Sequence, residues 1–145
     1  GRMPAKEVLS LETRAADPRE AEALKLEPGA MVHAYEGLSL ADDQPVALFR
    51  SVFPAARFPD LPQTLERLHS VTAALAEHGV PDYTRSWTRL NAKLASPTQA
   101  LHLRLREGDP ILRTVAVNVD PQGQPVEYGH TWFAGDRVTL TLSEN

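Results

Sequence analysis

The sequence contains no cysteine among its 145 residues. This excludes a disulfide framework, a thiol nucleophile and thiolate ligands for a metal. No signal peptide is visible, and no apolar run approaches the length of a membrane span. We therefore expect a cytoplasmic protein that works in a reducing compartment and has no membrane partner.

A basic surface is also missing. The formal net charge is -4, and lysine and arginine do not cluster along the chain. Because contacts with nucleic-acid phosphates need a basic surface, we expect no nucleic-acid binding by this chain alone. The five histidines show no metal-ligand spacing and there is no glycine-rich phosphate loop, so we expect neither a metal nor a cofactor.

The composition indicates a single globular domain over residues 1–145. Hydrophobic residues make up 42% and charged residues 23%, and the length allows a sizeable core. The opening Gly1-Arg2-Met3-Pro4 is compatible with a tag remnant or a cut linker, so we expect that the natural protein has further residues upstream.

The spacing of apolar residues, together with proline and glycine signals, predicts an α+β chain. The expected strands are residues 7–14, 32–40, 46–53, 83–94, 111–119, 126–133 and 138–142. The expected helices are residues 18–26, 62–68, 70–79 and 97–105.

The chain contains an internal repeat. When the first half is shifted by 79 positions, Pro18 meets Pro97 and Gly29 meets Gly108, and after one more residue Gln44-Pro45-Val46 meets Gln124-Pro125-Val126. Each copy reads as strand, helix, strand, hairpin, strand. We therefore predict a mostly antiparallel, six-stranded sheet with approximate two-fold symmetry and helices packed on it, in which residues 62–79 form an insert between the copies.

The stretch from Ser70 to Arg89 has the features of an anion site. Ser70 is a helix N-cap, and the free amides of a first helical turn favour a phosphate-like group. In the strand that follows, a period of two places Arg85 and Arg89 on one face and Thr88 on the other. An ordinary helix cap with surface arginines is the alternative, and the residues leave open which face turns inward. If the hydroxyl face does, the arginines belong to the surface or to a dimer contact.

The two copies differ at positions that could form a second wall of such a site. Arg50 lies on an apolar strand face between Leu48 and Val52, so it needs either a carboxylate partner or a bound anion. Glu127 and Tyr128 stand where the first copy has alanine and leucine.

Several motifs in combination resemble the UTRA effector domain, the C-terminal, ligand-sensing half of transcription regulators of the GntR superfamily, HutC subfamily. They are L-A-D-D-Q-P-V, S-V-T-x-x-L-x-x-x-G-V, Y-T-R-S-W-T-R-L-N-A, A-L-H-L-x-x-x-x-G-D-P-I-L and G-Q-P-V-E-Y-G-x-T-x-F-A-G-D-R. The resemblance as a whole extends over residues 8–142. The pieces D-Y-T-R-S-x-T-R and E-Y-G-x-T-x-F look most like the regulators of phosphonate metabolism. The resemblance implies the chorismate lyase-like fold.

The resemblance also implies a function. We expect a non-enzymatic domain of a repressor that forms a homodimer, binds a small anionic effector such as a phosphonate or phosphate ester, and reaches DNA through an N-terminal winged helix-turn-helix domain absent from this chain. The candidate ligand-binding residues combine those implied by the resemblance with Arg50 and with Ser86 of the hydroxyl face. They are Arg50, Ser70, Val71, Thr72, Arg85, Ser86, Thr88, Arg89, Glu127 and Tyr128.

One departure bears on the ligand. Sugar-phosphate-sensing relatives carry an R-x-R pair where this sequence has Gly37 and Ser39. This argues against a typical phosphosugar and leaves Arg50 to supply the charge. The alternatives are an enzyme of chorismate lyase type, for which no nucleophile or other evident chemistry is present, and a dimerisation module without a ligand.

Overall fold

The computed structural model describes residues 3–143; Gly1 and Arg2 of the opening segment lie outside this range. Six strands and four helices follow one another in this part of the chain. In order they are β1 (Pro4–Ala15), α1 (Pro18–Leu24), β2 (Met31–Ala41), β3 (Gln44–Pro54), α2 (Leu61–Leu68), α3 (Val71–Glu77), β4 (Thr84–Leu94), α4 (Pro97–Leu103), β5 (Pro110–Val119) and β6 (Pro125–Ala134). None of these helices is long and apolar enough to cross a membrane.

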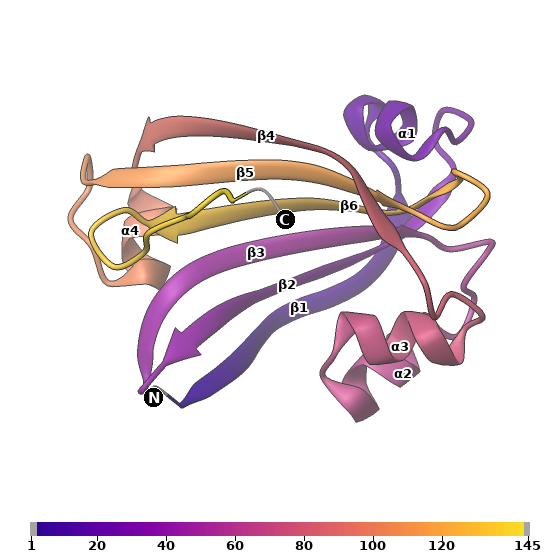
Figure 1. Ribbon diagram of the computed structural model, residues 1–145, viewed down its shortest axis with the longest axis horizontal. Coiled ribbons are helices and arrows are strands. Elements are labelled where there is room, and N and C mark those ends of the chain that lie inside the picture. Colours follow the sequence, from indigo (N-terminus) through magenta and orange to yellow (C-terminus); the bar gives the residue numbers. More distant parts are fainter. Residues whose placement is uncertain (1–2, 144–145) are drawn as a thin grey trace.

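The strands form one antiparallel sheet with the order β1-β2-β3-β6-β5-β4 (Figure 1). The order of the second half mirrors that of the first, and β3 and β6 meet in the middle. Each half has the order strand, helix, strand, strand, and α2 with α3 is the insert between them. The predicted α+β class and six-stranded antiparallel sheet are confirmed.

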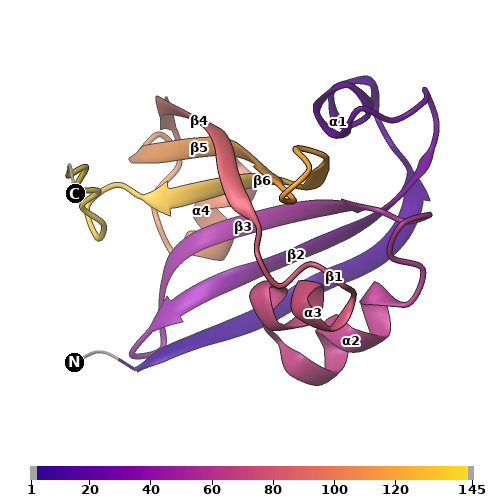
Figure 2. The same ribbon diagram turned by 45° about the vertical axis from the view of Figure 1, so that its right-hand side comes forward.

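The helices cover both faces of the sheet (Figure 2). On one face α1 packs on apolar residues such as Val32 and Val52, and α4 packs further along on Leu38 and Ile111. On the other face α2 and α3 pack on residues that include Tyr35 and Phe53. Because side chains alternate along a strand, neighbouring residues of β2 and β3 serve two separate cores.

The two repeated helices begin with the same device. In α1 the side chain of Asp17 accepts a hydrogen bond from the backbone N–H of Glu20, and the Glu20 carboxylate accepts one from the N–H of Asp17. In α4 the same two bonds join Ser96 and Gln99. Both helices end two residues earlier than predicted, at left-handed residues with φ near 56° and 55°. Each end is stabilised by a backbone N–H that bonds back to the preceding turn.

The predicted strand at residues 138–142 is wrong: this segment has no regular structure. Its alternating valine and leucines fit a strand pattern, but Leu142 is 89% exposed and no neighbouring strand pairs with the segment. Alternation alone does not form a strand without a partner edge. Arg137 anchors the chain just before it by donating to the carbonyls of Pro45, Leu103 and Arg104.

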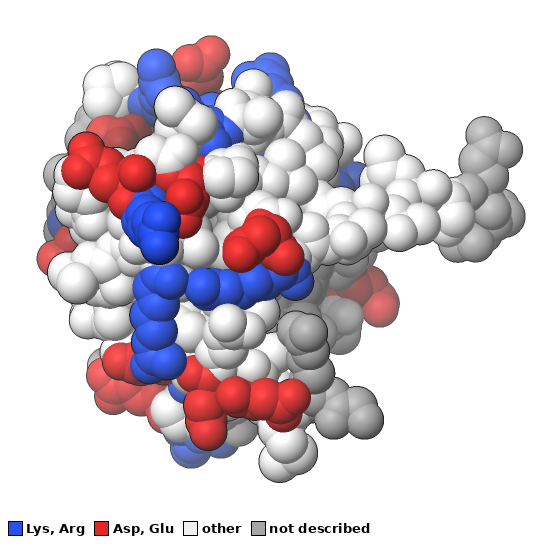
Figure 3. All heavy atoms as spheres, turned by 90° about the vertical axis from the view of Figure 1, so that its left-hand side faces the viewer, with Lys and Arg blue, Asp and Glu red and all other residues white. Residues whose placement is uncertain are grey.

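Figure 3 shows the side of the molecule that contains α4 and the turn between β2 and β3. Basic side chains in the middle of this side are bordered by acidic ones. Such mixed charge lacks the continuous positive potential that attracts a nucleic-acid backbone.

Gly37 occupies a crowded position on β2. A Cβ atom there would lie 2.6 Å from the backbone oxygen of Glu7 and 2.7 Å from the ring of Phe49. The Phe49 ring and the Glu7 backbone therefore fill the space that a side chain at position 37 would need, and no larger side chain fits without moving β1.

We expect Gly37→Ala to lower the free energy of unfolding by roughly 2 kcal/mol, because the clash with the Glu7 backbone oxygen can be relieved only by displacing an edge strand. Urea unfolding of the variant and of Gly129→Ala measures this. At Gly129 the nearest atom to a new Cβ, the Ser51 hydroxyl oxygen, is 3.9 Å away, so that control should change stability little. Equal losses in both variants would contradict the steric account.

Candidate functional site

A β-bulge in β4 decides which side chains share a face. Arg85 pairs with Asn118 and Trp87 with Val117, so Ser86 is the extra residue and the register shifts between them. The Arg85 guanidinium donates to Thr88 Oγ1 at 2.8 Å, whereas Trp87 packs against the α1 core. The prediction that Arg85 shares a face with Arg89, opposite Thr88, is therefore wrong, because the bulge moves Arg85 to the hydroxyl face.

On that face lies a polar cavity of about 240 Å³ between α3 and the sheet, which we call the α3 pocket. It draws on both halves of the repeat and on the insert, as expected for a site where symmetric halves meet. Its lining residues are Ser51, Val71, Tyr83, Arg85, Thr114, Ala116, Asn118, Glu127, Gly129 and Thr131.

A chain of hydrogen bonds orders the polar groups of the α3 pocket. Arg85 Nε donates to Asn118 Oδ1 at 2.7 Å, and Asn118 Nδ2 donates to Glu127 Oε1 at 2.8 Å. Asn118 and Glu127 are buried, with 8% and 9% exposure. Within residues 3–143 no carboxylate lies within ion-pair distance of Arg85. The pocket thus holds a positioned guanidinium without a direct ionic partner, joined through an amide to a buried acid.

The start of α3 borders the same pocket. Ser70 Oγ accepts from the N–H of Ala73 at 3.2 Å, so it is the predicted N-cap, and Thr72 Oγ1 lies 2.6 Å from the hydroxyl oxygen of Tyr83. With seven residues α3 has a short dipole, so the larger positive charge here is that of Arg85.

Three predicted residues lie on the opposite face of the sheet. Arg89 and Tyr128 line a second cavity beside α1, and Arg50 lies opposite His130 across the β3–β6 pair. Arg50 therefore cannot take over the role of the missing arginine pair in the α3 pocket. Its partners are Glu36, 3.8 Å away, and the ring of Trp132, whose centroid is 5.5 Å from the guanidinium.

Of the ten predicted residues, the structure brings Val71, Arg85 and Glu127 into the α3 pocket. Three more lie beside the pocket: Ser70 caps α3, Thr72 contacts the hydroxyl group of Tyr83, and Thr88 accepts a hydrogen bond from Arg85. Ser86 is the bulge residue. Their role in ligand binding remains a prediction. The sequence reading missed Asn118, although β5 carried a signal: on an apolar strand, alternate residues Thr114, Ala116 and Asn118 are small or polar.

His130 has an unusual environment on the α1 side. Burial lowers its pKa from 6.5 to about 4, and the cations Arg50 and Arg113 act in the same direction, against weaker opposition from Glu20 and Asp17. No group of three or more acidic or histidine side chains suited to a metal ion occurs within residues 3–143. His130 is therefore a neutral imidazole at neutral pH, between two cations.

This pKa predicts a pH dependence of stability. Between pH 6.5 and about 4 the unfolded chain binds a proton at His130 and the folded chain does not, so stability rises with pH over this interval. The shift sets an upper limit of about 3.4 kcal/mol on this change in stability. Urea unfolding at pH 4.5, 5.5 and 7 should give a steeper rise for the wild type than for His130→Gln, in which all other titrating groups are retained. Parallel profiles would show that the folded protein does not resist protonation of His130.

Comparisons with known proteins agree with this architecture. The model of the UTRA domain family matches residues 1–139, so the chain belongs to that family. An uncharacterised HTH-type transcriptional regulator of Rhizobium meliloti is 38% identical over 122 residues, which are 84% of this chain and 50% of that protein. The HTH-type transcriptional repressor PhnF of Mycolicibacterium smegmatis is 27% identical over 126 residues, 87% of this chain and 51% of PhnF.

Solved structures show the same fold. The effector domain of PhnF from Mycobacterium smegmatis superposes with a TM-score of 0.92 at 24% identity, covering 99% of this chain and 88% of that one. The ligand-binding domain of a GntR-family regulator from Bordetella bronchiseptica gives a TM-score of 0.87 at 21% identity, covering 99% and 90%. The sequence relatives are transcription regulators and not enzymes, which does not favour the chorismate lyase alternative. The chain spans about half the length of each of the two sequence relatives.

Proposed function

We propose that this chain is the ligand-sensing, dimerising domain of a bacterial transcription repressor, and that a small phosphonate or phosphate ester binds in the α3 pocket to control operator binding. The observation that carries the proposal is Arg85. Its guanidinium is fixed by Asn118 and Thr88 in a polar pocket and has no direct carboxylate partner among the described residues.

The geometry leaves Arg85 free to bind an anion. A guanidinium has five N–H donors, of which Asn118 takes one and Thr88 another. The remaining donors can bind two oxygens of one phosphonate group side by side. The hydroxyls of Thr114 and Thr131 and the α3 start would complete the set of donors. Glu127, held by Asn118, would face the remainder of the ligand and accept from a hydroxyl or ammonium group.

The size of the α3 pocket supports a small ligand. At about 240 Å³ it is below the roughly 300–1,000 Å³ of pockets for drug-sized molecules. Phe49 covers position 37, where phosphosugar sensors carry the first arginine of their pair, in agreement with a compact phosphonate or simple phosphate ester.

Control of transcription requires a DNA-binding part. The relatives, which are about twice as long, are HTH-type regulators, and one is named a repressor. We propose that the full-length protein of this chain likewise has an N-terminal winged helix-turn-helix domain, belongs to the HutC subfamily and works as a homodimer. The effector would favour one arrangement of the two DNA-binding heads through its higher affinity for that arrangement.

Isothermal titration calorimetry with a panel of alkyl phosphonates, aminoalkyl phosphonates, simple phosphate esters and neutral analogues tests the ligand class. We expect at least one phosphonate or phosphate ester to bind with one site per chain, and the neutral analogue of the same skeleton not to bind. If no phosphorus-containing anion binds, or if the neutral analogue binds equally well, the proposal fails.

A further inference from the structure

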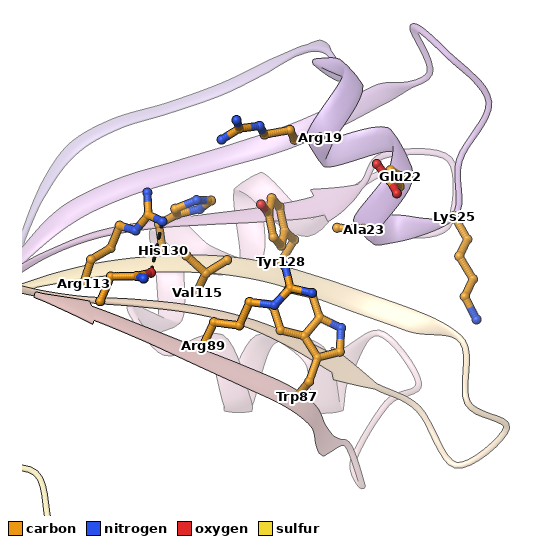
Figure 4. A pocket seen from close by; sticks show the side chains of 11 residues that line it. Arg19, Glu22, Ala23, Lys25, Trp87, Arg89, Arg113, Val115, Tyr128 and His130 are labelled. Atoms are coloured by element: carbon orange, nitrogen blue, oxygen red, sulfur yellow. Dashed lines mark hydrogen bonds between the residues drawn. The ribbon is translucent and has the colours of Figure 1, made fainter.

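A second and larger cavity lies on the opposite face of the sheet, between α1 and strands β4, β5 and β6 (Figure 4). Its volume is about 600 Å³, within the range of small-molecule sites. It exists because α1 and α4 cover the two ends of this face and leave the middle to polar side chains. No part of the proposed function uses it.

The walls of this α1 cavity carry an excess of positive charge. Arg19 and Lys25 come from α1 and its end, and Arg89 and Arg113 from the sheet, against the single acid Glu22. Figure 4 shows Arg19 extending from α1 toward the end of the cavity where Arg113 lies, whereas Lys25 points away. Three arginines therefore approach the cavity from two facing walls.

Arg89 and Arg113 are held in place by neighbouring side chains other than carboxylates. The Arg89 guanidinium lies over the Trp87 ring, 4.6 Å from its centroid, and Arg113 donates to the Asn91 side chain at 3.3 Å. Within residues 3–143 neither arginine makes an ion pair, and nor does Arg19. The acids at the start of α1 are engaged elsewhere: Asp17 caps the helix, and Glu20 is bound by Arg14 through two hydrogen bonds.

A separate observation concerns unpaired polar atoms beside this cavity. The Nε atoms of Arg50 and Arg113 and Nδ1 of His130 are buried and have no hydrogen-bond partner among residues 3–143. Buried polar groups nearly always have one, and three unpaired atoms on the adjacent strands β3, β6 and β5 are a concentration that needs an explanation. The two unpaired arginine N–H groups are donors, so a ligand with acceptor oxygens would supply the hydrogen bonds that they lack.

We propose that the α1 cavity binds a small polyanion, a molecule with two or more carboxylate or phosphate groups on a short carbon skeleton. Arg19 and Arg113 bind one anionic group at the end near His130. Arg89, already oriented by its stacking on Trp87, binds the other. The apolar part of the wall, formed by Ala23, Val115 and the Tyr128 ring, contacts the skeleton.

The tryptophans provide a selective probe, because Trp87 lines this cavity and no tryptophan lines the α3 pocket. In the variant Trp132→Phe, Trp87 is the sole tryptophan of the chain. Its fluorescence is measured while citrate or inorganic pyrophosphate is added at constant ionic strength, which removes general screening effects.

We expect a saturable fluorescence change with at least one probe. A response to citrate alone identifies a polycarboxylate site, and a response to pyrophosphate alone identifies a phosphate site. In the same background, Arg113→Gln and Arg19→Gln should each weaken binding about tenfold or more. Arg67→Gln, which removes an equal charge from the exposed side of α2, should not.

Circular dichroism and thermal unfolding serve to check that each variant is folded. Arg19 is exposed on the surface of α1, so we expect Arg19→Gln to fold. Absence of a saturable change with both probes overturns the proposal. So does binding that survives both arginine substitutions or is abolished by Arg85→Gln, which would place it in the α3 pocket. Failure of phosphonates in calorimetry would not affect this result, so the two proposals can fail separately.

Discussion

Glu20→Ala is expected to lower the free energy of unfolding by roughly 2 to 3 kcal/mol, because it removes the buried partner of the half-buried Arg14, which is 32% exposed, and opens the capping box of α1. Glu20 is 2% exposed and binds Arg14 at 2.7 and 2.9 Å while it also accepts the N–H of Asp17. Burial alone would raise its pKa, but the hydrogen bonds from Arg14 and Asp17 outweigh burial and lower it. Its contribution is therefore present at neutral pH and declines as the pH falls through the acid range. Urea unfolding at pH 7 gives the size of the effect.

The second copy of the repeat supplies the control for this prediction. Gln99 occupies the position of Glu20 in α4 and closes the same capping box without a charge. Glu20→Gln should therefore retain the cap, lose the ionic part of the contact with Arg14 and cost less than Glu20→Ala. Gln99→Ala, which removes the bond from the Ser96 N–H that closes the capping box and keeps the Ser96 cap itself, should cost about 1 kcal/mol. If Glu20→Ala costs no more than Gln99→Ala, the buried ion pair contributes nothing and this account of α1 is wrong.

Arg85→Ala is expected to weaken binding of the anionic ligand by about 100-fold or more, because hydrogen bonds between charged groups contribute about 1.5–3 kcal/mol each and Arg85 would make two. Arg85→Lys keeps the positive charge but loses the planar pair of N–H donors, so its ligand affinity should lie between those of Arg85→Ala and the wild type. Calorimetry with the strongest ligand of the phosphonate panel measures both.

Arg89→Gln is the matched control for Arg85, because it removes an arginine four residues away whose side chain lies on the other face of the same strand. It should leave phosphonate affinity within about twofold. A loss at Arg89 with none at Arg85 would move the effector site to the α1 cavity.

The fold could be predicted from the sequence to the extent that it depends on local signals repeated in both copies. Pro18 and Pro97 follow matching N-caps, and the two helices that they begin take equivalent places in mirrored halves of the sheet. Because the strand and helix pattern occurs twice, each copy supports the interpretation of the other. Together they indicate one antiparallel sheet in which the last strands of the two halves lie side by side in the middle. The prediction of a strand at residues 138–142 is wrong because alternation forms a strand only where a neighbouring strand can pair with it.

The site could be predicted only in part, because the decisive feature is not local. Alternation along β4 gave the wrong face for Arg85, since the bulge at Ser86 is a property of the pairing with β5. The alternation of side chains along a strand also separates Glu127 from Tyr128, which line opposite cavities, and places Ser51 and Arg50 on opposite faces of the sheet. A set of residues that looked like one anion site is thus divided between two. Only the pairing register, which the sequence does not encode in any single segment, shows the division.

The most direct test of the central claim is a crystal structure of the chain with the phosphonate or phosphate ester that binds most strongly. We predict the phosphorus-bound oxygens within hydrogen-bond distance of the Arg85 guanidinium in the α3 pocket, with the rest of the ligand facing Glu127. An anion bound solely beside α1, or one in the α3 pocket that leaves Arg85 without a contact, would contradict the account.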